Sequence, residues 1–518
     1  MISLVDMAEA ARGANRSAIL PTAADAFSDA HSHGRIDEES GWYRARMPVS
    51  LPASGQQFAF SVELDACTGC KACVVACHSL NGLDDNELWR SVGVLHGTPF
   101  GHNGAEQRTV TTACHHCVDP ACLNGCPVDA YEKDLITGAV VHLDDQCIGC
   151  SYCTMTCPYE VPKFNDRLGI VRKCDMCRGR LVAGEEPACV QGCPNGAIRI
   201  ITIDQQLAVA EARYAASPAS LVPGTSLSSL SVPSTVYRTA LPTLDGLEDG
   251  DALLLLPSVR HDQLAAMLVL TQTAVGASIV SALLRVAGAD AGRSLATAVP
   301  LTAGLGMAIS LAHLGRPLKA WRVVLGLGHS WLSREAVALG AFLGLAGLHA
   351  AFVGSSIAAG LALVVAAVGA FGVFTSIKVY AVTGRAWWSH RRTTQRFAST
   401  ATVLGLAIAA VFSSGALRPL ALGTAVAAVC GLLSGRTSAL DPDVSVRRTA
   451  ALLSGPLRRH SRLCTGFALL GGALMLVAAV AASRSAAGAG AVSLIASALI
   501  ERSLFFRAVV PNRMPGGR

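Results

Sequence analysis

Charged residues are scarce in this sequence of 518 residues, since they make up only 15% of it while 51% of the residues are apolar. Acidic residues are nearly missing from residues 261–518, which hold 6 Asp and Glu against 23 Lys and Arg, a net charge of +17. Residues 1–260 hold 30 acidic and 19 basic residues, a net charge of −11. This composition excludes a disordered chain and a single soluble globule. Because the basic half is also the more apolar half, it indicates contact with lipid, and we expect no nucleic-acid partner.

The first 50 residues contain no stretch with the pattern of an export signal. Four charged residues interrupt Met1–Leu20, so the apolar core of a secretory signal does not form. No adjacent pair of arginines precedes an apolar stretch there, as a twin-arginine signal requires. A framework of disulfide bonds is therefore a poor explanation for the 18 cysteines, since such frameworks are typical of short secreted chains.

Sixteen of the cysteines form four groups of four, and the first and third groups share the spacing C-x2-C-x2-C-x3-C. Three cysteines on such a tight loop ligate one iron–sulfur cluster, while the fourth, usually followed by proline, ligates a neighbouring cluster. Zinc is the alternative, but it takes two separated C-x2-C pairs and leaves the third cysteine of each tight triplet unexplained. The groups are Cys67, Cys70, Cys73, Cys77; Cys114, Cys117, Cys122, Cys126; Cys147, Cys150, Cys153, Cys157; and Cys174, Cys177, Cys189, Cys193.

Four groups arranged in pairs predict an α+β, ferredoxin-like double domain over residues 58–203, with four 4Fe–4S clusters. Short strands are expected at Val140–Leu143 and Ala197–Ile203, each after a turn. A row of clusters without a substrate pocket transfers electrons, so no catalytic residue is predicted here. Residues 1–57 form an N-terminal extension. Residues 204–260, rich in Ser, Pro and Ala, are predicted to be either a flexible tether or an arm along a partner subunit.

Residues 261–518 contain eight apolar segments long enough to cross a bilayer, which takes about 20 residues. A buried soluble core is excluded, because eight such segments leave almost no amphipathic helices to cover them. The sequence therefore predicts an all-α bundle of eight transmembrane helices in a multi-pass protein of the inner (cytoplasmic) membrane. The segments are 263–286, 294–314, 334–354, 356–381, 397–416, 418–435, 463–483 and 486–508.

Basic residues are distributed unevenly between the two ends of these segments. The loops and C-terminus at the end that holds the cysteine domain contain 18 Lys and Arg, against 4 in the opposite loops. Because basic loops stay in the cytoplasm, the cysteine domain is predicted on the cytoplasmic side. Four tryptophans at the same end are expected to be interfacial anchors, namely Trp321, Trp331, Trp387 and Trp388.

The cysteine domain resembles the iron–sulfur subunit of the dimethyl sulfoxide reductase type, which is shared by many membrane-bound molybdoenzymes. The resemblance covers about Phe58–Ile203 and depends on the sixteen cysteines and on ACTGCKACVVACH, CHHCVDPACLNGCPVDA and CIGCSYCTMTCPYEVPKF. It implies that the first group pairs with the fourth and the second with the third. The implied ligand sets are Cys67, Cys70, Cys73, Cys193; Cys174, Cys177, Cys189, Cys77; Cys114, Cys117, Cys122, Cys157; and Cys147, Cys150, Cys153, Cys126.

The apolar half resembles the eight-span anchor of dimethyl sulfoxide reductase, which binds menaquinol without haem. The match is AHLGRPLKAWRVVLGLGHSWLSREAVALGAF, Ala312–Phe342, with a weaker one in ERSLFFRAVVPNRMPG. It implies quinol-binding roles for His313 and Glu335. Quinol oxidation releases protons, so ionisable groups at a span end are useful there. The structural alternatives are a histidine that caps helix carbonyls and an ion pair of Glu335 with Arg334 or Arg316.

Together the two resemblances imply a fusion of subunits that are often separate. We expect an electron-transfer and anchor subunit that oxidises (mena)quinol and passes electrons to a separate molybdopterin-containing catalytic subunit. No haem is expected, since His313 and His349 lie at unmatched depths of their spans. In that family the iron–sulfur subunit faces the periplasm, whereas the charges here favour the cytoplasm, so an assimilatory nitrate reductase is the leading expectation. The alternatives are a sulfoxide or N-oxide reductase, a dehydrogenase that reduces quinone, and a quinone-coupled transport module.

Overall fold

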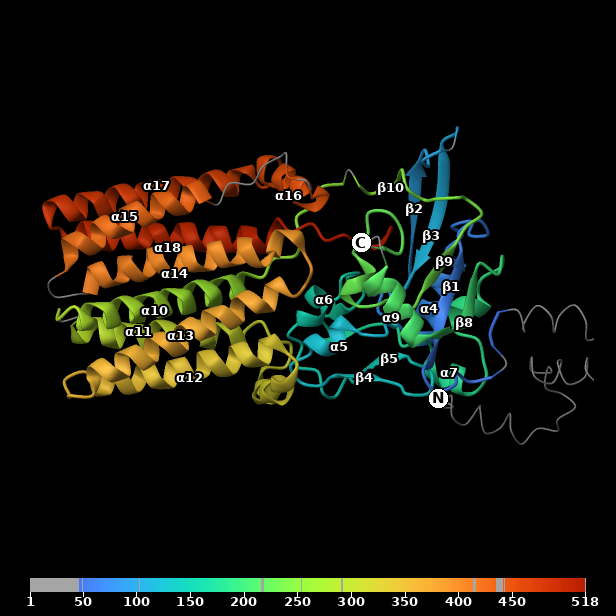
Figure 1. Ribbon diagram of the computed structural model, residues 1–518, viewed down its shortest axis with the longest axis horizontal. Coiled ribbons are helices and arrows are strands. Elements are labelled where there is room, and N and C mark those ends of the chain that lie inside the picture. Colours follow the sequence, from blue (N-terminus) through green and yellow to red (C-terminus); the bar gives the residue numbers. More distant parts are fainter. Residues whose placement is uncertain are drawn as a thin grey trace, which may run out of the picture.

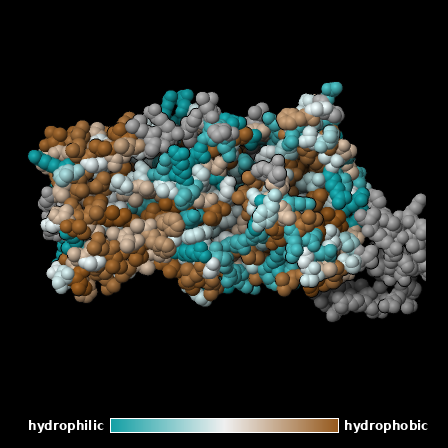
Figure 2. All heavy atoms as spheres, viewed as in Figure 1, coloured by the Kyte–Doolittle hydropathy of each residue, from teal (hydrophilic) through white to brown (hydrophobic). Residues whose placement is uncertain are grey.

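The computed structural model shows two parts arranged end to end, a domain of short strands and helices and a bundle of long, roughly parallel helices (Figure 1). Apolar side chains dominate the far end of the bundle, and hydrophilic ones are frequent around the junction and on the other part (Figure 2). Most of the predicted N-terminal extension lies outside the described residues. The structure describes residues 46–48, 50–101, 103–215, 219–252, 254–289, 292–412, 416–434, 441 and 443–517.

The cysteine domain is built around two small sheets and two hairpins. β1 (Gln56–Glu63) is buried along most of its length, with Phe58 and Phe60 in the core, and pairs antiparallel with β8 (Ile198–Asp204). Both predicted strands are found, since Val140–His142 forms β5. The remaining strands are β2 (Ser91–Gly97), β3 (Glu106–Thr112), β4 (Tyr131–Lys133), β6 (Lys163–Asn165), β7 (Ile170–Arg172), β9 (Val236–Arg238) and β10 (Leu247–Asp249).

Short helices accompany the cysteine groups. In the first and third groups, Lys71 and Ser151 precede a helix and adopt the left-handed conformation, with φ of 62° and 56°. This conformation is strained for residues with a side chain, so it persists only where the surrounding loop fixes it. The equal spacing of the two groups thus produces equal loop conformations at these positions. The helices are α4 (Ala72–Asn81), α5 (Ala121–Gly125), α6 (Tyr152–Thr156), α7 (Arg178–Val182) and α8 (Ala188–Gln191).

The described residues of the segment 204–260 include helices and strands, which a flexible tether would not show, and the arm along a partner subunit stays a prediction. It begins with α9 (Gln205–Tyr214) and later contains the short η2 (Ser228–Leu230). β9 then joins β1 in parallel, and β10 joins β2, so the segment completes both sheets of the protein's own cysteine domain. The hydroxyl of Tyr237 donates to the carbonyl of Thr111 at 3.2 Å. Strands of three residues are too short to show a period of two in the sequence.

The helical part is confirmed as multi-pass, since seven helices of the described residues are long and apolar enough to cross a membrane. An eighth apolar helix, α15 (Leu417–Ser434), packs beside them, and the count of eight spans stays a prediction. Residues 413–415 and 435–440, on either side of α15, lie outside the described residues. The seven are α10 (Asp262–Val286), α11 (Arg293–Leu311), α12 (Trp331–Ala351), α13 (Ala358–Ala381), α14 (His390–Phe412), α17 (Arg458–Ala481) and α18 (Arg484–Arg507); between them lie η3 (Pro317–Gly328), η4 (Ala386–Trp388) and α16 (Val444–Ser454).

The helices form two groups of four, α10 to α13 and α14, α15, α17 and α18. Glycines allow the groups to approach closely where α10 crosses α14. A Cβ atom on Gly276 would lie 1.8 Å from the carbonyl oxygen of Ala401, and one on Gly405 would lie 2.4 Å from the backbone of Gly276. Small residues at such crossings are the usual means of packing helices in a membrane, where no hydrophobic effect drives them together.

The C-terminal tail returns from the bundle to the cysteine domain (Figure 1). Met514 is 2% exposed and packs in the same core cluster as Leu95 of β2 and Val110 of β3. The tail backbone lies so close to β2 that a Cβ atom on Gly93 would lie 2.1 Å from Pro515. Arg513 adds an ion pair with Glu160. The anchor is therefore attached to the cysteine domain at both of its ends.

Candidate functional site

The structure brings the sixteen cysteines together in four mixed sets. Residues Cys67, Cys70, Cys73 and Cys193 line one small cavity, and Cys114, Cys117, Cys122 and Cys157 line another. The thiol of Cys77 lies within electrostatic reach of Cys174, Cys177 and Cys189. The thiol of Cys153 lies within the same reach of Cys126, Cys147 and Cys150. In each set, one cysteine therefore comes from a different group than the other three.

These sets suit a multi-atom cluster better than a single ion. Among the described residues, no group of three His, Cys, Asp or Glu side chains has the close geometry of a single-ion site. In a cubane iron–sulfur cluster, each of the four thiolates binds a different corner, so the sulfur atoms lie farther apart than around one metal ion. Two buried cations accompany the thiols, Arg90 near Cys77 and Lys173 near Cys122, and they offset the negative charge of thiolates. No motif in the sequence marks either cation.

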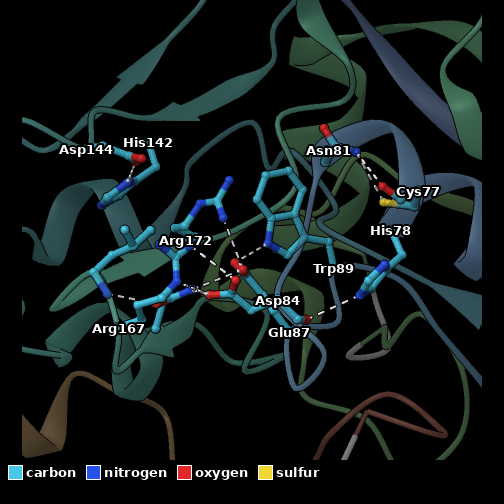
Figure 3. Close-up of polar contacts among 12 residues, drawn as sticks. Cys77, His78, Asn81, Asp84, Glu87, Trp89, His142, Asp144, Arg167 and Arg172 are labelled. Atoms are coloured by element: carbon cyan, nitrogen blue, oxygen red, sulfur yellow. Dashed lines mark hydrogen bonds and ion pairs between the residues drawn. The ribbon is translucent and has the colours of Figure 1, made fainter. Parts of the chain in front are cut away.

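A polar network joins the two halves of the cysteine domain (Figure 3). Glu87, which is 4% exposed, accepts from the indole of Trp89 at 2.9 Å and from Arg172 of β7 at 3.1 Å. Arg172 also lies over the ring of Trp89, 5.1 Å from its centroid. Nearby, Arg167 donates twice to Asp84, at 3.1 Å each. The loop after the first cysteine group is thus fixed to the hairpin after the third.

The loops of the second and third cysteine groups contact the bundle directly. Ser330, just before α12, donates to the carbonyl of Gly125 at 2.7 Å. The hydroxyl of Tyr152, inside the third group, donates to the carbonyl of Val379 in α13 at 2.7 Å. The amide of Gly315 lies 3.3 Å from the carbonyl of Gly149. The cysteine set with Cys150 is therefore the one that lies against the membrane part.

Gly315 lies between two backbones and leaves no room for a side chain. A Cβ atom there would lie 2.0 Å from the carbonyl oxygen of Gly169. We expect Gly315→Ala to separate the third cysteine group from the bundle, with a destabilisation of about 1–3 kcal/mol. Thermal unfolding followed by the visible absorbance of the clusters measures it. Gly340→Ala in α12 is the matched control, because open space surrounds that position; equal unfolding midpoints for the two variants would contradict the expectation.

His313 lies at the junction, in the turn after α11. Its Nδ1 is at hydrogen-bond distance from the carbonyl of Ser310, the capping contact that the structural alternative predicted. The backbone of Cys150 and the ring of His261, just before α10, are also within interaction reach. Burial lowers the pKa of His313, although the carbonyls oppose the shift. Burial, together with the neighbouring His313, lowers the pKa of His261 to about 4. Both rings are therefore held neutral near pH 7.

Glu335 is 3% exposed on α12, and Ser376 of α13 donates to its carboxylate. It forms no ion pair with Arg334, whose guanidinium donates instead to the carbonyls of Leu327 and Gly328 at 3.0 and 2.7 Å. The hydroxyls of Tyr152 and Tyr380 lie within electrostatic reach of the carboxylate. No hydrogen bond or ion pair joins Glu335 to His313 in the described residues.

Two predicted anchor tryptophans are instead buried. Trp387 and Trp388 are 2% and 1% exposed, and both indoles donate to the carbonyl of Phe505, at 3.2 and 3.0 Å. The turn η4 folds under the end of α18, which the sequence pattern does not reveal. Arg502 is one of the 18 basic residues at the end of the bundle that holds the cysteine domain. It is fully buried in α18 and donates to Gln272 at 3.2 Å. Its guanidinium lies 4.2 Å from the ring centroid of Phe397.

Fold and site together define an iron–sulfur electron-transfer domain fused to a multi-pass membrane anchor. Residues 106–203 match the family model of the 4Fe-4S dicluster domain, and residues 260–507 match that of the DMSO reductase anchor subunit (DmsC). The protein is 34% identical over 157 residues to the B subunit of the anaerobic dimethyl sulfoxide reductase of Haemophilus influenzae, an alignment that covers 29% of this sequence and 76% of the relative. The corresponding B subunit of Escherichia coli is 37% identical over 155 residues, with coverages of 29% and 75%.

A third relative has another activity in its name. The iron–sulfur subunit of formate dehydrogenase-O of Escherichia coli is 34% identical over 175 residues, 31% of this sequence and 58% of the relative. The protein belongs to the family of iron–sulfur subunits represented by the B subunit of dimethyl sulfoxide reductase. The same polypeptide also carries the match to the DmsC-type anchor. The predicted fusion is thereby confirmed.

Proposed function

We propose that the protein oxidises a quinol at the junction of its two parts and delivers the electrons through the cysteine domain to a separate catalytic subunit. The observation that carries this proposal is the position of the third cysteine group. Its loop contacts the turn before η3 and the helix α13, next to His313 and Glu335. A quinol bound there would have cluster ligands on one side and ionisable groups on the other.

The four mixed cysteine sets are the ligands that we assign to four 4Fe–4S clusters. Each cluster, when bound, accepts and releases one electron at a time. The protein's fold buries most of the sixteen cysteines. Arg90 and Lys173 neutralise part of the charge in the interior. Each of the four sets contains four cysteines, because no other residue takes the place of a cysteine at any of the sixteen positions.

Glu335 is proposed to accept a proton as quinol is oxidised. The carboxylate is buried and is oriented by Ser376, and among the described residues it forms no ion pair with a basic side chain. His313, neutral near pH 7, is positioned to accept a hydrogen bond or a second proton from the other end of the quinol ring. Histidine and carboxylate thus have different roles, since only the carboxylate lies within a span.

The catalytic partner is proposed to contain molybdopterin, because the sequence contains no substrate-binding motif and its matching relatives are named as subunits of dimethyl sulfoxide reductase and formate dehydrogenase. The basic residues at the junction favour a cytoplasmic position for it. A cytoplasmic partner that accepts electrons from quinol is best explained as an assimilatory nitrate reductase.

This assignment predicts that quinol oxidation coupled to nitrate reduction generates no membrane potential. Protons would be released and consumed on the same side of the membrane. The measurement is a potential-sensitive dye in liposomes that contain the purified complex with its catalytic partner, quinol and nitrate.

The cytoplasmic position also predicts the outcome of reporter fusions. A fluorescent protein fused to Arg518 is expected to fluoresce, and alkaline phosphatase fused to the same residue is expected to be inactive. A dye response with nitrate, or an active phosphatase fusion, would contradict the cytoplasmic assignment.

The reverse direction is the second candidate, favoured by the identity to the formate dehydrogenase-O subunit. In that case the partner oxidises a donor such as formate and the junction reduces quinone. The two directions differ in the reduction potentials of the clusters relative to menaquinone. Redox titration of the purified complex distinguishes them, since delivery to quinone requires potentials below that of the menaquinone couple.

A further inference from the structure

The second group of helices borders a large, partly open cavity that the proposed function does not use. Helices α14, α15, α17 and α18 contact one another in a ring. A cavity of about 1080 Å³ lies between them, lined by the first turns of α14 and α17 and the last turns of α15 and α18. These helix ends face the cysteine domain (Figure 1). Small-molecule sites have volumes of about 300–1,000 Å³, so the space suits a whole molecule rather than a few waters.

The lining changes from charged to apolar with depth. On α14 the lining residues are spaced about one turn apart and run from Arg391 through Gln395 and Ser399 to Val403. At about 1.5 Å per residue, this stripe is about 18 Å long. On α17 the lining also becomes apolar with depth, from the hydroxyls of Ser461 and Thr465 to Leu469. The wall thus has a cationic end at the junction, hydroxyl groups in the middle and an aliphatic floor.

The cationic end has an excess of positive charge. Arg396 pairs with Glu501 at 2.7 Å and lies 4.0 Å from the ring centroid of Trp387. Arg392 pairs with Asp441. Each carboxylate near the cavity therefore already has an arginine. In the part of the sequence that the structure describes, no ion pair is found for Arg391, which lines the mouth. An anionic group is the complement of this end.

We propose that this cavity binds one anionic phospholipid, with its phosphate at Arg391 and Arg392. Its ester groups would then meet the hydroxyls of Ser399 and Thr465, and an acyl tail the aliphatic floor. Basic pockets between transmembrane helices bind anionic lipid headgroups in this manner. An anionic lipid fits this end better than a neutral quinol, because a neutral ring offers no charge to Arg391. Moreover, none of the cysteine-loop residues lines this cavity.

The experiment compares lipids retained by the full-length protein, purified with its catalytic partner in mild detergent. Native mass spectrometry and lipid extraction are expected to find about one phosphatidylglycerol or cardiolipin per polypeptide. The double variant Arg391→Gln/Arg392→Gln should retain at least about tenfold less, since each arginine near a membrane surface contributes about 1 kcal/mol of lipid binding. The matched control is Arg458→Gln/Arg459→Gln, two exposed arginines at the same end of the bundle that do not line the cavity.

Thr465→Phe serves as a second variant, because it fills the middle of the cavity without removing a charge; it should also release the lipid. Added phosphatidylglycerol should raise the unfolding temperature of the delipidated wild type, while phosphatidylethanolamine and inorganic phosphate should not. The proposal is overturned if only zwitterionic lipid or quinone is retained, if inorganic phosphate stabilises equally, or if both double variants lose lipid to the same extent. Quinol-driven cluster reduction, measured in parallel, tests the junction separately.

Discussion

The double variant Cys150→Ala/Cys153→Ala is expected to lose one whole cluster, about four iron atoms per polypeptide, and with it all reduction by quinol. Both thiols belong to the set that lies against the bundle, through the contact of Gly149 with Gly315. Removing two of four ligands prevents a cluster from assembling, whereas one missing thiolate is often replaced by another ligand. Iron analysis and electron paramagnetic resonance of the dithionite-reduced protein measure the loss.

The other three sets should remain filled and reducible by dithionite, because their ligands are untouched. The protein offers its own control in Cys430 and Cys464, the two cysteines of the anchor. Cys430→Ala/Cys464→Ala is expected to keep the full iron content and the wild-type rate. If quinol still reduces the remaining clusters of the Cys150→Ala/Cys153→Ala variant, electrons enter the cysteine domain elsewhere, and the junction is not the entry point.

Glu335→Gln is expected to slow quinol-dependent cluster reduction by about 10²–10⁴-fold, the usual contribution of a positioned base. Glutamine has the same shape and can accept the hydrogen bond from Ser376, but it cannot take a proton. Stopped-flow reduction of the clusters by a menaquinol analogue measures the rate. Reduction by dithionite should be unchanged, since it does not pass through the junction.

Two further variants separate proton transfer from packing. Ser376→Ala removes the group that orients the carboxylate and should slow the reaction much less than Glu335→Gln does. Glu501→Gln changes a carboxylate of the other helix group, whose ion pairs are with Arg396 and Arg502, and should leave the rate unchanged. A wild-type rate in Glu335→Gln would falsify the role of this carboxylate, and His313→Ala would then be the variant to examine.

The sequence was informative where a pattern repeats over many residues. The spacing of the first and third cysteine groups predicted a ferredoxin-like domain, and the left-handed Lys71 and Ser151 show how one spacing forms one loop twice. The long apolar segments predicted the transmembrane helices in the same way. The pairing of distant groups, such as Cys77 with Cys189, required the resemblance, because spacing says nothing about which loops meet in space.

Short and long-range features were missed for physical reasons. Strands β9 and β10 have three residues each, and their stability comes from joining existing sheets rather than from their own pattern. Trp387 resembles an interfacial anchor in sequence but is covered by the end of α18. His261 lies beside His313 only because the polypeptide folds back after the second sheet. Such residues acquire their role from tertiary contacts alone.

The returning tail gives the fused protein a property that two separate subunits lack. Covalent linkage converts association into an intramolecular event, with an effective concentration in the millimolar range for short linkers. Met514 and Gly93 add a second attachment, which leaves the bundle beside the first, since Ser258 donates to the carbonyls of Arg507 and Val509. The interface between the two parts therefore does not have to supply the free energy of assembly. The contacts of this interface need only fix the orientation of the cysteine domain relative to the anchor. The fusion also ensures that each iron–sulfur domain is synthesised with one anchor.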